Sequence, residues 1–117
     1  MEKQFIPYEQ ALELKALGFD QDGLGWYNVG HLMPKITESK HITPLPNCCI
    51  APLYQQAFAF FRNRFGYTFS IGRTNICVYH LMVQGTLLTN MIQDCKSYEE
   101  AELKCLIEFI NAAKQNL

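Results

Sequence analysis

The sequence predicts an α+β fold in which helices pack on one face of an antiparallel sheet, giving two layers. Two observations carry this prediction. Residues 51–66 and 97–113 repeat apolar side chains at three- and four-residue steps, as amphipathic helices do. Residues 67–92 instead form three short runs separated by turn sequences, which is typical of a three-stranded meander. One or two further strands are expected before residue 51.

Length and composition are those of one globular domain covering residues 1–117. Hydrophobic residues make up 49% and charged residues 18%, a balance far from that of disordered chains. The formal net charge is −1, so the chain as a whole does not attract nucleic acid or an anionic membrane. No stretch is apolar enough to span a membrane, and the amino-terminal residues lack the apolar core of a secretory signal. We therefore expect a cytoplasmic protein.

The first predicted element is a helix over residues 6–19. Pro7 suits its first turn, where a helix does not need the missing N–H. Gly18 followed by Phe19 is typical of a Schellman ending, in which Phe19 packs back near Leu14. The sequence therefore marks both ends of this helix.

A short strand and a long connection are expected next. Residues 26–29 lie between glycines and predict the strand. Residues 31–49 contain three prolines and a polar run, so they predict a long surface connection. A strand near Leu32 or near Ile42 is an option within it.

Residues 51–66 predict the central helix of the core. Pro52 suits the first turn, and Gly66 suits the left-handed position that follows the last turn. Burying large side chains on one face contributes about 1.5–3 kcal/mol each. That face is expected to contain Tyr54, Ala57, Phe58, Phe61 and Phe65.

The meander begins with residues 67–71, whose alternation of apolar and polar side chains predicts a half-buried strand. Residues 76–83 are almost wholly apolar and predict a central strand covered, at least in part, on both faces. Gln84 and Gly85 form the next turn, and residues 86–92 give a third, weaker strand.

The last helix is expected to start at Ser97, which caps it while Glu100 returns the hydrogen bond in a capping box. Its acidic first turn complements the helix dipole and needs no catalytic explanation. The buried stripe is expected to consist of Ala101, Cys105, Leu106, Phe109, Ile110 and Ala113.

Three stretches together resemble a known family: FIPYEQALELKALGFD, APLYQQAFAFFRNRFG and SYEEAELKCLIEFI. In this order they resemble a family of short, uncharacterised proteins encoded by phages and mobile elements of gut anaerobes. The resemblance covers roughly half of the chain, all of it in the three predicted helices. It implies no assigned activity, cofactor or site residue. What it does imply is a mobile-element accessory protein that binds a host or phage component.

Cysteine and histidine side chains are the first candidates for a site. The five cysteines are odd in number and include no CxxC pair, so neither a disulfide framework nor a zinc ribbon is indicated. His31, His41, Cys48 and Cys49 are zinc-ligand types, but adjacent cysteines do not easily occupy two corners of a tetrahedron. We therefore expect no metal and no other cofactor.

A thiol-dependent enzyme is one alternative function. Cys48 and Cys49 precede the expected amino end of the central helix, where unpaired N–H groups lower a thiol pKa. The other interpretation is a loop in which Cys49 and Ile50 pack under that helix as apolar side chains. We favour a non-enzymatic protein and assign no catalytic residue.

Nucleic-acid binding is the other alternative. From residue 52 to residue 116 the order of helix, three strands and helix is that of a double-stranded RNA-binding domain. Such domains contact phosphates with lysines at the start of the final helix, whereas residues 96–100 carry one base and two acids here. Nucleic acid is therefore a disfavoured partner. The residues that could still form a small patch are Arg62, Arg64, Arg73 and Tyr67.

Aromatic residues outside the main core stripe are the remaining signal. Trp26 and Tyr27 lie in a glycine-flanked segment, and Phe60 falls off the stripe of the 51–66 helix. Such residues form either a partner surface, including a symmetric homodimer, or a second buried face. We predict a small accessory protein that binds another, unidentified protein. The candidate binding residues are Trp26, Tyr27, Cys48, Cys49, Phe60, Arg62, Arg64, Tyr67 and Arg73.

Overall fold

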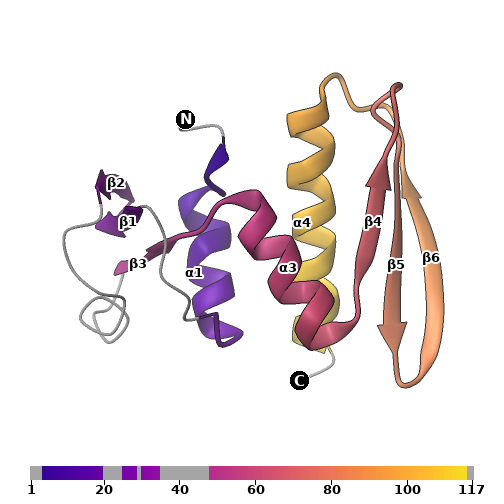
Figure 1. Ribbon diagram of the computed structural model, residues 1–117, viewed down its shortest axis with the longest axis horizontal. Helices are drawn as coiled ribbons and strands as arrows, with labels where there is room; N and C mark the ends of the chain where they lie inside the picture. The colour runs from indigo at the N-terminus through magenta and orange to yellow at the C-terminus, as the bar shows by residue number, and fades with distance from the viewer. Residues whose placement is uncertain (1–3, 20–24, 29, 35–47, 116–117) are drawn as a thin grey trace. The chain divides into compact units, whose positions relative to one another are not determined.

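The computed structural model describes residues 4–19, 25–28, 30–34 and 48–115. These residues contain three helices and two three-stranded antiparallel sheets, which confirms the predicted α+β fold class (Figure 1). The elements in chain order are α1 (Tyr8–Ala16), β1 (Gly25–Asn28), β2 (His31–Pro34), β3 (Cys48–Ala51), α3 (Tyr54–Phe65), β4 (Thr68–Ile71), β5 (Cys77–Val83), β6 (Thr86–Ile92) and α4 (Tyr98–Gln115).

The chain divides into two compact units, Met1–Ala57 and Phe58–Leu117, with the boundary inside α3. One sheet belongs to the first unit and contains β1, β2 and β3, and the other belongs to the second unit and contains β4, β5 and β6. The strands expected before the central helix therefore form a sheet of their own and do not extend the meander. The expectation of one domain over residues 1–117 stays a prediction.

Helix α1 is shorter at both ends than the sequence predicts. Pro7 is its N-cap, with φ of −62° and ψ of 156°, and the Pro7 carbonyl accepts the N–H of Ala11 at 2.9 Å. At the other end the N–H of Phe19 donates to the carbonyl of Leu14 at 3.0 Å. Gly18 has φ of 101°, the left-handed conformation that a Schellman ending requires. The predicted ending is therefore confirmed.

The first sheet has the order β2-β1-β3, with β1 antiparallel to both neighbours. Strand β2 contains Leu32, one of the two positions suggested for a strand, whereas Ile42 lies outside the described residues. Strand β3 is a correction, because residues 48–50 were expected in a loop and Ala51 in the central helix. All four of its side chains are buried, so the sequence shows no alternation there, and Pro44 and Pro46 favour a loop.

Helix α3 begins at Tyr54, two residues after the predicted start at Pro52. The carbonyl of Pro52 instead accepts a backbone N–H from the amino-terminal segment of the first unit at 2.9 Å. Leu53 caps the helix, and its N–H donates to Oε1 of Gln56 at 2.9 Å, which is the side-chain half of a capping box. The helix ends before Gly66, whose φ of 77° confirms the predicted left-handed ending.

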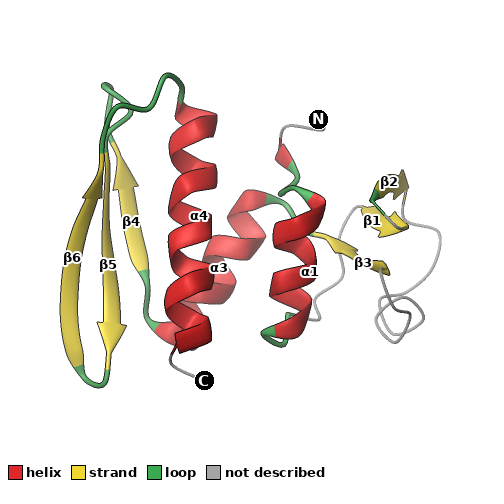
Figure 2. Cartoon of the chain, turned by 180° about the vertical axis from the view of Figure 1, so that it is seen from behind, coloured by secondary structure: helices red, strands yellow, loops and turns green. Residues whose placement is uncertain are grey.

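The second sheet is the predicted meander, in the order β4-β5-β6. Helix α4 and the part of α3 that belongs to this unit lie on one side of the sheet (Figures 1 and 2). The Phe109 ring of α4 has centroid distances of 5.7 Å to Phe58, 6.2 Å to Phe69 and 6.1 Å to Tyr79. This aromatic cluster is the core of the second unit.

Helix α4 has the predicted Ser97 cap and the predicted buried stripe, but the hydrogen bond that Glu100 was expected to return to Ser97 goes to the N–H of Lys96. Oγ of Ser97 accepts the N–H of Glu100 at 3.1 Å. The Glu100 carboxylate accepts the N–H of Lys96 at 2.7 Å and lies 3.2 Å from Nζ of Lys104. The hydrogen bond from Lys96 and the nearby Lys104 ammonium lower the pKa of the Glu100 carboxyl. The buried residues are Ala101, Cys105, Leu106, Phe109, Ile110 and Ala113, as expected.

Candidate functional site

Four of the predicted binding residues come together in the first sheet. Trp26 and Tyr27 lie on β1, Cys48 and Cys49 lie on β3, and Tyr27 is the register partner of Cys49. Tyr27 and both cysteines are buried, and Trp26 is half-buried. These side chains are therefore mainly packed inside the protein and offer little surface to a partner.

Hydrogen bonds hold this group in place within the first unit. Oη of Tyr27 donates to the carbonyl of Ile6 at 2.6 Å, and Nζ of Lys15 donates to the carbonyl of Cys48 at 2.8 Å. Sγ of Cys48 donates to Oδ1 of Asn28 at 3.6 Å. These bonds fasten α1 and the amino-terminal segment to β1 and β3, so their role is structural.

The Cys49 thiol lies in an environment that disfavours a nucleophile. Strand β3 ends at Ala51 and α3 begins at Tyr54, so neither cysteine lies at the amino end of a helix as expected. Burial raises the pKa of Cys49 to about 11, although the nearby Lys15 ammonium opposes this shift. A reactive cysteine needs a lowered pKa, so this geometry does not support a thiol-dependent enzyme acting through Cys49.

Phe60 and Tyr67 are both buried. For Phe60 the sequence allowed either a partner surface or a second buried face. The Phe60 ring meets Phe61 edge-on at 5.4 Å, and the Arg64 guanidinium carbon lies 5.8 Å from its centroid. The Tyr67 ring is nearly parallel to that of Phe61, at 6.1 Å and 11°. For Phe60 the second buried face is therefore the correct interpretation, and Tyr67 offers no ring for base stacking.

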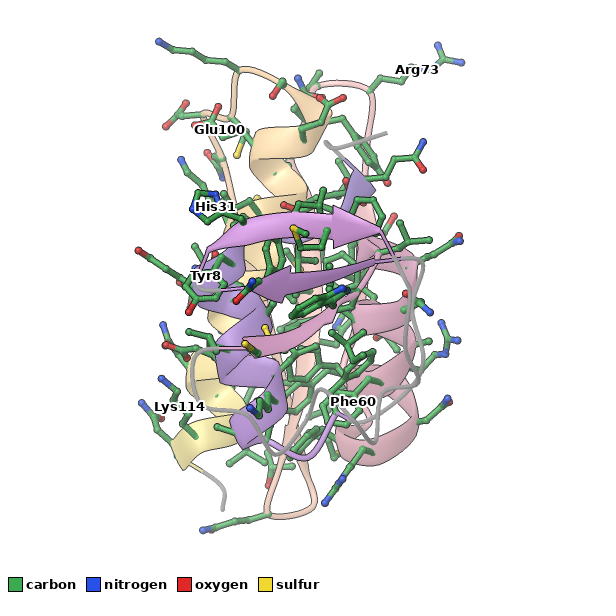
Figure 3. The ribbon with its side chains drawn as sticks, turned by 90° about the vertical axis from the view of Figure 1, so that its left-hand side faces the viewer. Tyr8, His31, Phe60, Arg73, Glu100 and Lys114 are labelled. Atoms are coloured by element: carbon green, nitrogen blue, oxygen red, sulfur yellow. The ribbon has the colours of Figure 1, made fainter. Side chains whose placement is uncertain are left out.

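The three candidate arginines do not form one basic patch. Arg62 and Arg64 are exposed in the last turn of α3, before β4, whereas Arg73 lies in the turn after β4. The length of that strand separates them. The Arg73 side chain points away from the ribbon (Figure 3).

The start of α4 also disfavours nucleic-acid binding. Its first turn contains Glu99 and Glu100, and Glu100 is already paired with Lys104. Acidic side chains at this position repel a phosphate backbone. The order of elements from α3 to α4 matches the expected helix, three strands and helix. Binding of nucleic acid nevertheless stays a prediction that these charges disfavour.

The face of the second sheet that is turned away from α4 carries exposed apolar side chains. Phe69 and Tyr79 contact Phe109 of α4, so the alternate residues of β4 and β5 face the other way. Met82 is 43% exposed, Leu87 57% and Met91 53%. We define the outer apolar patch as two directly opposed cross-strand pairs, Val78 with Met91 and Met82 with Leu87.

Polar side chains surround the patch on the same face. Between its two pairs, Nδ1 of His80 lies 2.9 Å from Oγ1 of Thr89. On β4 the exposed residues are Thr68 and Ser70, which pair with β5 in register. The apolar half of the face therefore adjoins β6, one of the two edge strands of the sheet (Figure 2).

Sequence reasoning missed this patch. Residues 76–83 were expected to be covered at least partly on both faces, but on the outer face Val78 and His80 are only half-buried and Met82 is exposed. The sequence feature that could have indicated an exposed apolar surface is the run from Gln84 to Gln93, which contains no charged residue and forms the end of the meander.

The described residues contain neither a group of metal ligands nor a membrane-spanning helix. No three of their His, Cys, Asp or Glu side chains are grouped as a metal site requires. His31 is exposed on β2, whereas His41 lies outside the described ranges. Within those ranges no helix combines the length and apolar character needed to cross a bilayer.

Comparisons with protein-family models, with curated proteins and with solved structures find no match. The function is therefore inferred from the surfaces of this chain alone.

Proposed function

We propose that this protein acts by binding another protein through the outer apolar patch and the adjoining strand β6. The supporting observation is the exposure of Leu87 and Met91 on an edge strand, at 57% and 53%. Each cross-strand pair of the patch places large apolar side chains next to each other in water, and such exposure is typical of partner-binding surfaces. The buried Cys49 thiol supports a non-enzymatic role, and the free cysteines suit the cytoplasm.

The partner that fits this surface presents an extended segment with apolar side chains. A sheet edge offers unpaired backbone groups, and a strand added there gains main-chain hydrogen bonds. Side chains at alternate positions of the added strand would then contact Leu87 and Met91. The resemblance to phage and mobile-element proteins suggests an accessory role in such an element.

Site-specific photocrosslinking tests this proposal. Benzoylphenylalanine replaces Leu87 in one variant and the exposed Asn111 of α4 in a control variant. After irradiation in the expressing cells, we expect protein adducts from position 87 well above those from position 111. Adding Met91→Lys to the first variant should remove these adducts, because a charge in the patch opposes apolar contact. Equal adduct levels at the two positions would overturn the proposal.

A further inference from the structure

Strand β6 is an edge strand with an open side. It spans Thr86–Ile92 and pairs with β5 along all seven residues, and no other described strand pairs with it. Six of its seven side chains are exposed, and only Ile92 is half-buried. Figure 1 shows β6 at one edge of its sheet.

The geometry of the β5–β6 hairpin identifies which backbone groups face the open side. Gln84 and Gly85 form a two-residue turn with φ of 52° and 80°, which is a type I′ combination. The i to i+3 hydrogen bond of such a turn joins Val83 and Thr86. Hydrogen-bonded and non-hydrogen-bonded pairs then alternate along the ladder. The N–H and C=O groups of Leu87, Thr89 and Met91 consequently point away from β5.

Within the described part of the chain, β6 shows none of the usual protections of a sheet edge. Natural edges are blocked by lysine, proline, a bulge or a covering element. The run from Gln84 to Gln93 contains no charged residue and no proline, and its register with β5 is continuous. The strand is thus open to pairing with another strand along its length.

We propose that the partner of this surface is a second copy of the chain, bound by antiparallel pairing of β6 with the partner's β6. The proposal rests on the proposed function and names its partner. A two-fold axis at Thr89 places Leu87, Thr89 and Met91, whose backbone groups point away from β5, opposite the same set of residues in the partner. The two three-stranded sheets then join into a single six-stranded sheet. In this register Thr89 faces the partner's Thr89, and Leu87 faces the partner's Met91.

Self-pairing is favoured because the outer face of β6 is complementary to itself in this register. On the outer face the apolar Leu87 meets the apolar Met91 at both ends, and the small Thr89 lies on the axis. No like charges meet, since β6 carries none. The ladder gains about six N–H···O bonds, two from each opposed pair. The interface is small, below about 1,200 Å², so we expect a reversible dimer with a Kd on the order of micromolar.

Sedimentation velocity at concentrations from about 1 µM to about 1 mM tests the dimer. The wild type should change from monomer to dimer across this range. Thr89→Pro removes an outward N–H that β5 does not use, so it should give a monomer. Thr68→Lys is the matched control, because it places a charge on the same face of the sheet but on β4, outside the patch and away from β6. This variant should dimerise with a Kd within about threefold of the wild type, as added surface charges change free energies little.

A charge-swap pair keeps the test valid if the proline variant does not fold. Leu87→Lys with Met91→Lys sets lysines opposite lysines across the axis, and Leu87→Glu with Met91→Glu does the same with acids. Each double variant alone should be monomeric, whereas an equal mixture should form a heterodimer.

Three results would overturn self-pairing. They are a wild type that stays monomeric at the highest concentration, a dimer lost in Thr68→Lys but kept in Thr89→Pro, and a mixture of the double variants that does not associate. Adducts only to other proteins at position 87, with a monomeric wild type, would leave the proposed function standing.

Discussion

At the scale of single residues, the cysteines differ in how much water reaches them. Cys49, Cys77 and Cys105 are buried, and burial raises the pKa of each thiol, that of Cys49 to about 11. At pH 8 a thiol with this pKa is about one thousandth thiolate, whereas an ordinary thiol is about a quarter thiolate. Only the thiolate reacts with alkylating reagents. Cys95 is half-buried in the loop before α4.

Iodoacetamide labelling at pH 8, read by mass spectrometry, should therefore modify Cys95 at least tenfold faster than those three cysteines. Cys95→Ser should remove this fast reaction, and labelling in urea should make all cysteines react at similar rates. Rapid labelling of Cys49 in the folded protein would contradict the prediction and restore the thiol-dependent alternative.

At the scale of elements, features with a local signal were predictable from the sequence. Gly18 and Gly66 marked helix ends because their left-handed conformations suit glycine. Strand β6 and the buried stripe of α4 also have their predicted positions. Strand β3 could not be predicted, because pairing of Tyr27 with Cys49 joins residues far apart in sequence and leaves no local periodicity. Helix α3 starts late because Pro52 is engaged by a distant backbone group.

Gly85 in the β5–β6 turn tests how much a left-handed backbone conformation by itself contributes to stability, without any steric clash. An added Cβ would meet nothing within 4 Å at either Gly85 or Gly72. Gly85 has φ of 80°, whereas Gly72 is not in the left-handed region. Gly85→Ala should therefore lower the free energy of unfolding by about 1–2 kcal/mol, since an L-residue is strained there. The matched control, Gly72→Ala, should change it by less than about 0.5 kcal/mol.

Urea unfolding followed by circular dichroism measures both changes. A loss of stability that is equal in the two variants would contradict the assignment of strain to the backbone of Gly85.

At the scale of the whole molecule, the near-zero net charge leaves little electrostatic repulsion between copies. The formal net charge is −1 and the sequence pI is about 6.3. Proteins near their pI associate more readily, especially when they expose apolar surface. Exposure of Leu87 and Met91 was not predictable, because it depends on α4 covering only the other face of the sheet.

Static light scattering at low salt should consequently be greatest near pH 6.3. Leu87→Lys with Met91→Lys changes the formal charge at pH 7 from −1 to +1, so the maximum should move to higher pH and become smaller. Thr68→Lys with Ser70→Lys adds the same charge on the same face but keeps the patch. This control should move the maximum without reducing it as much, and identical curves for both variants would contradict a role for the patch.

The position of Phe109 late in the sequence determines when the core of the second unit can be completed during translation. Its ring contacts Phe58, Phe61, Tyr67, Phe69 and Tyr79, all of which leave the ribosome before it. The β5–β6 hairpin is local and forms within microseconds. Any sheet that forms before α4 is translated has its aromatic face uncovered, and translation of α4 sets the moment at which Phe109 can cover that face.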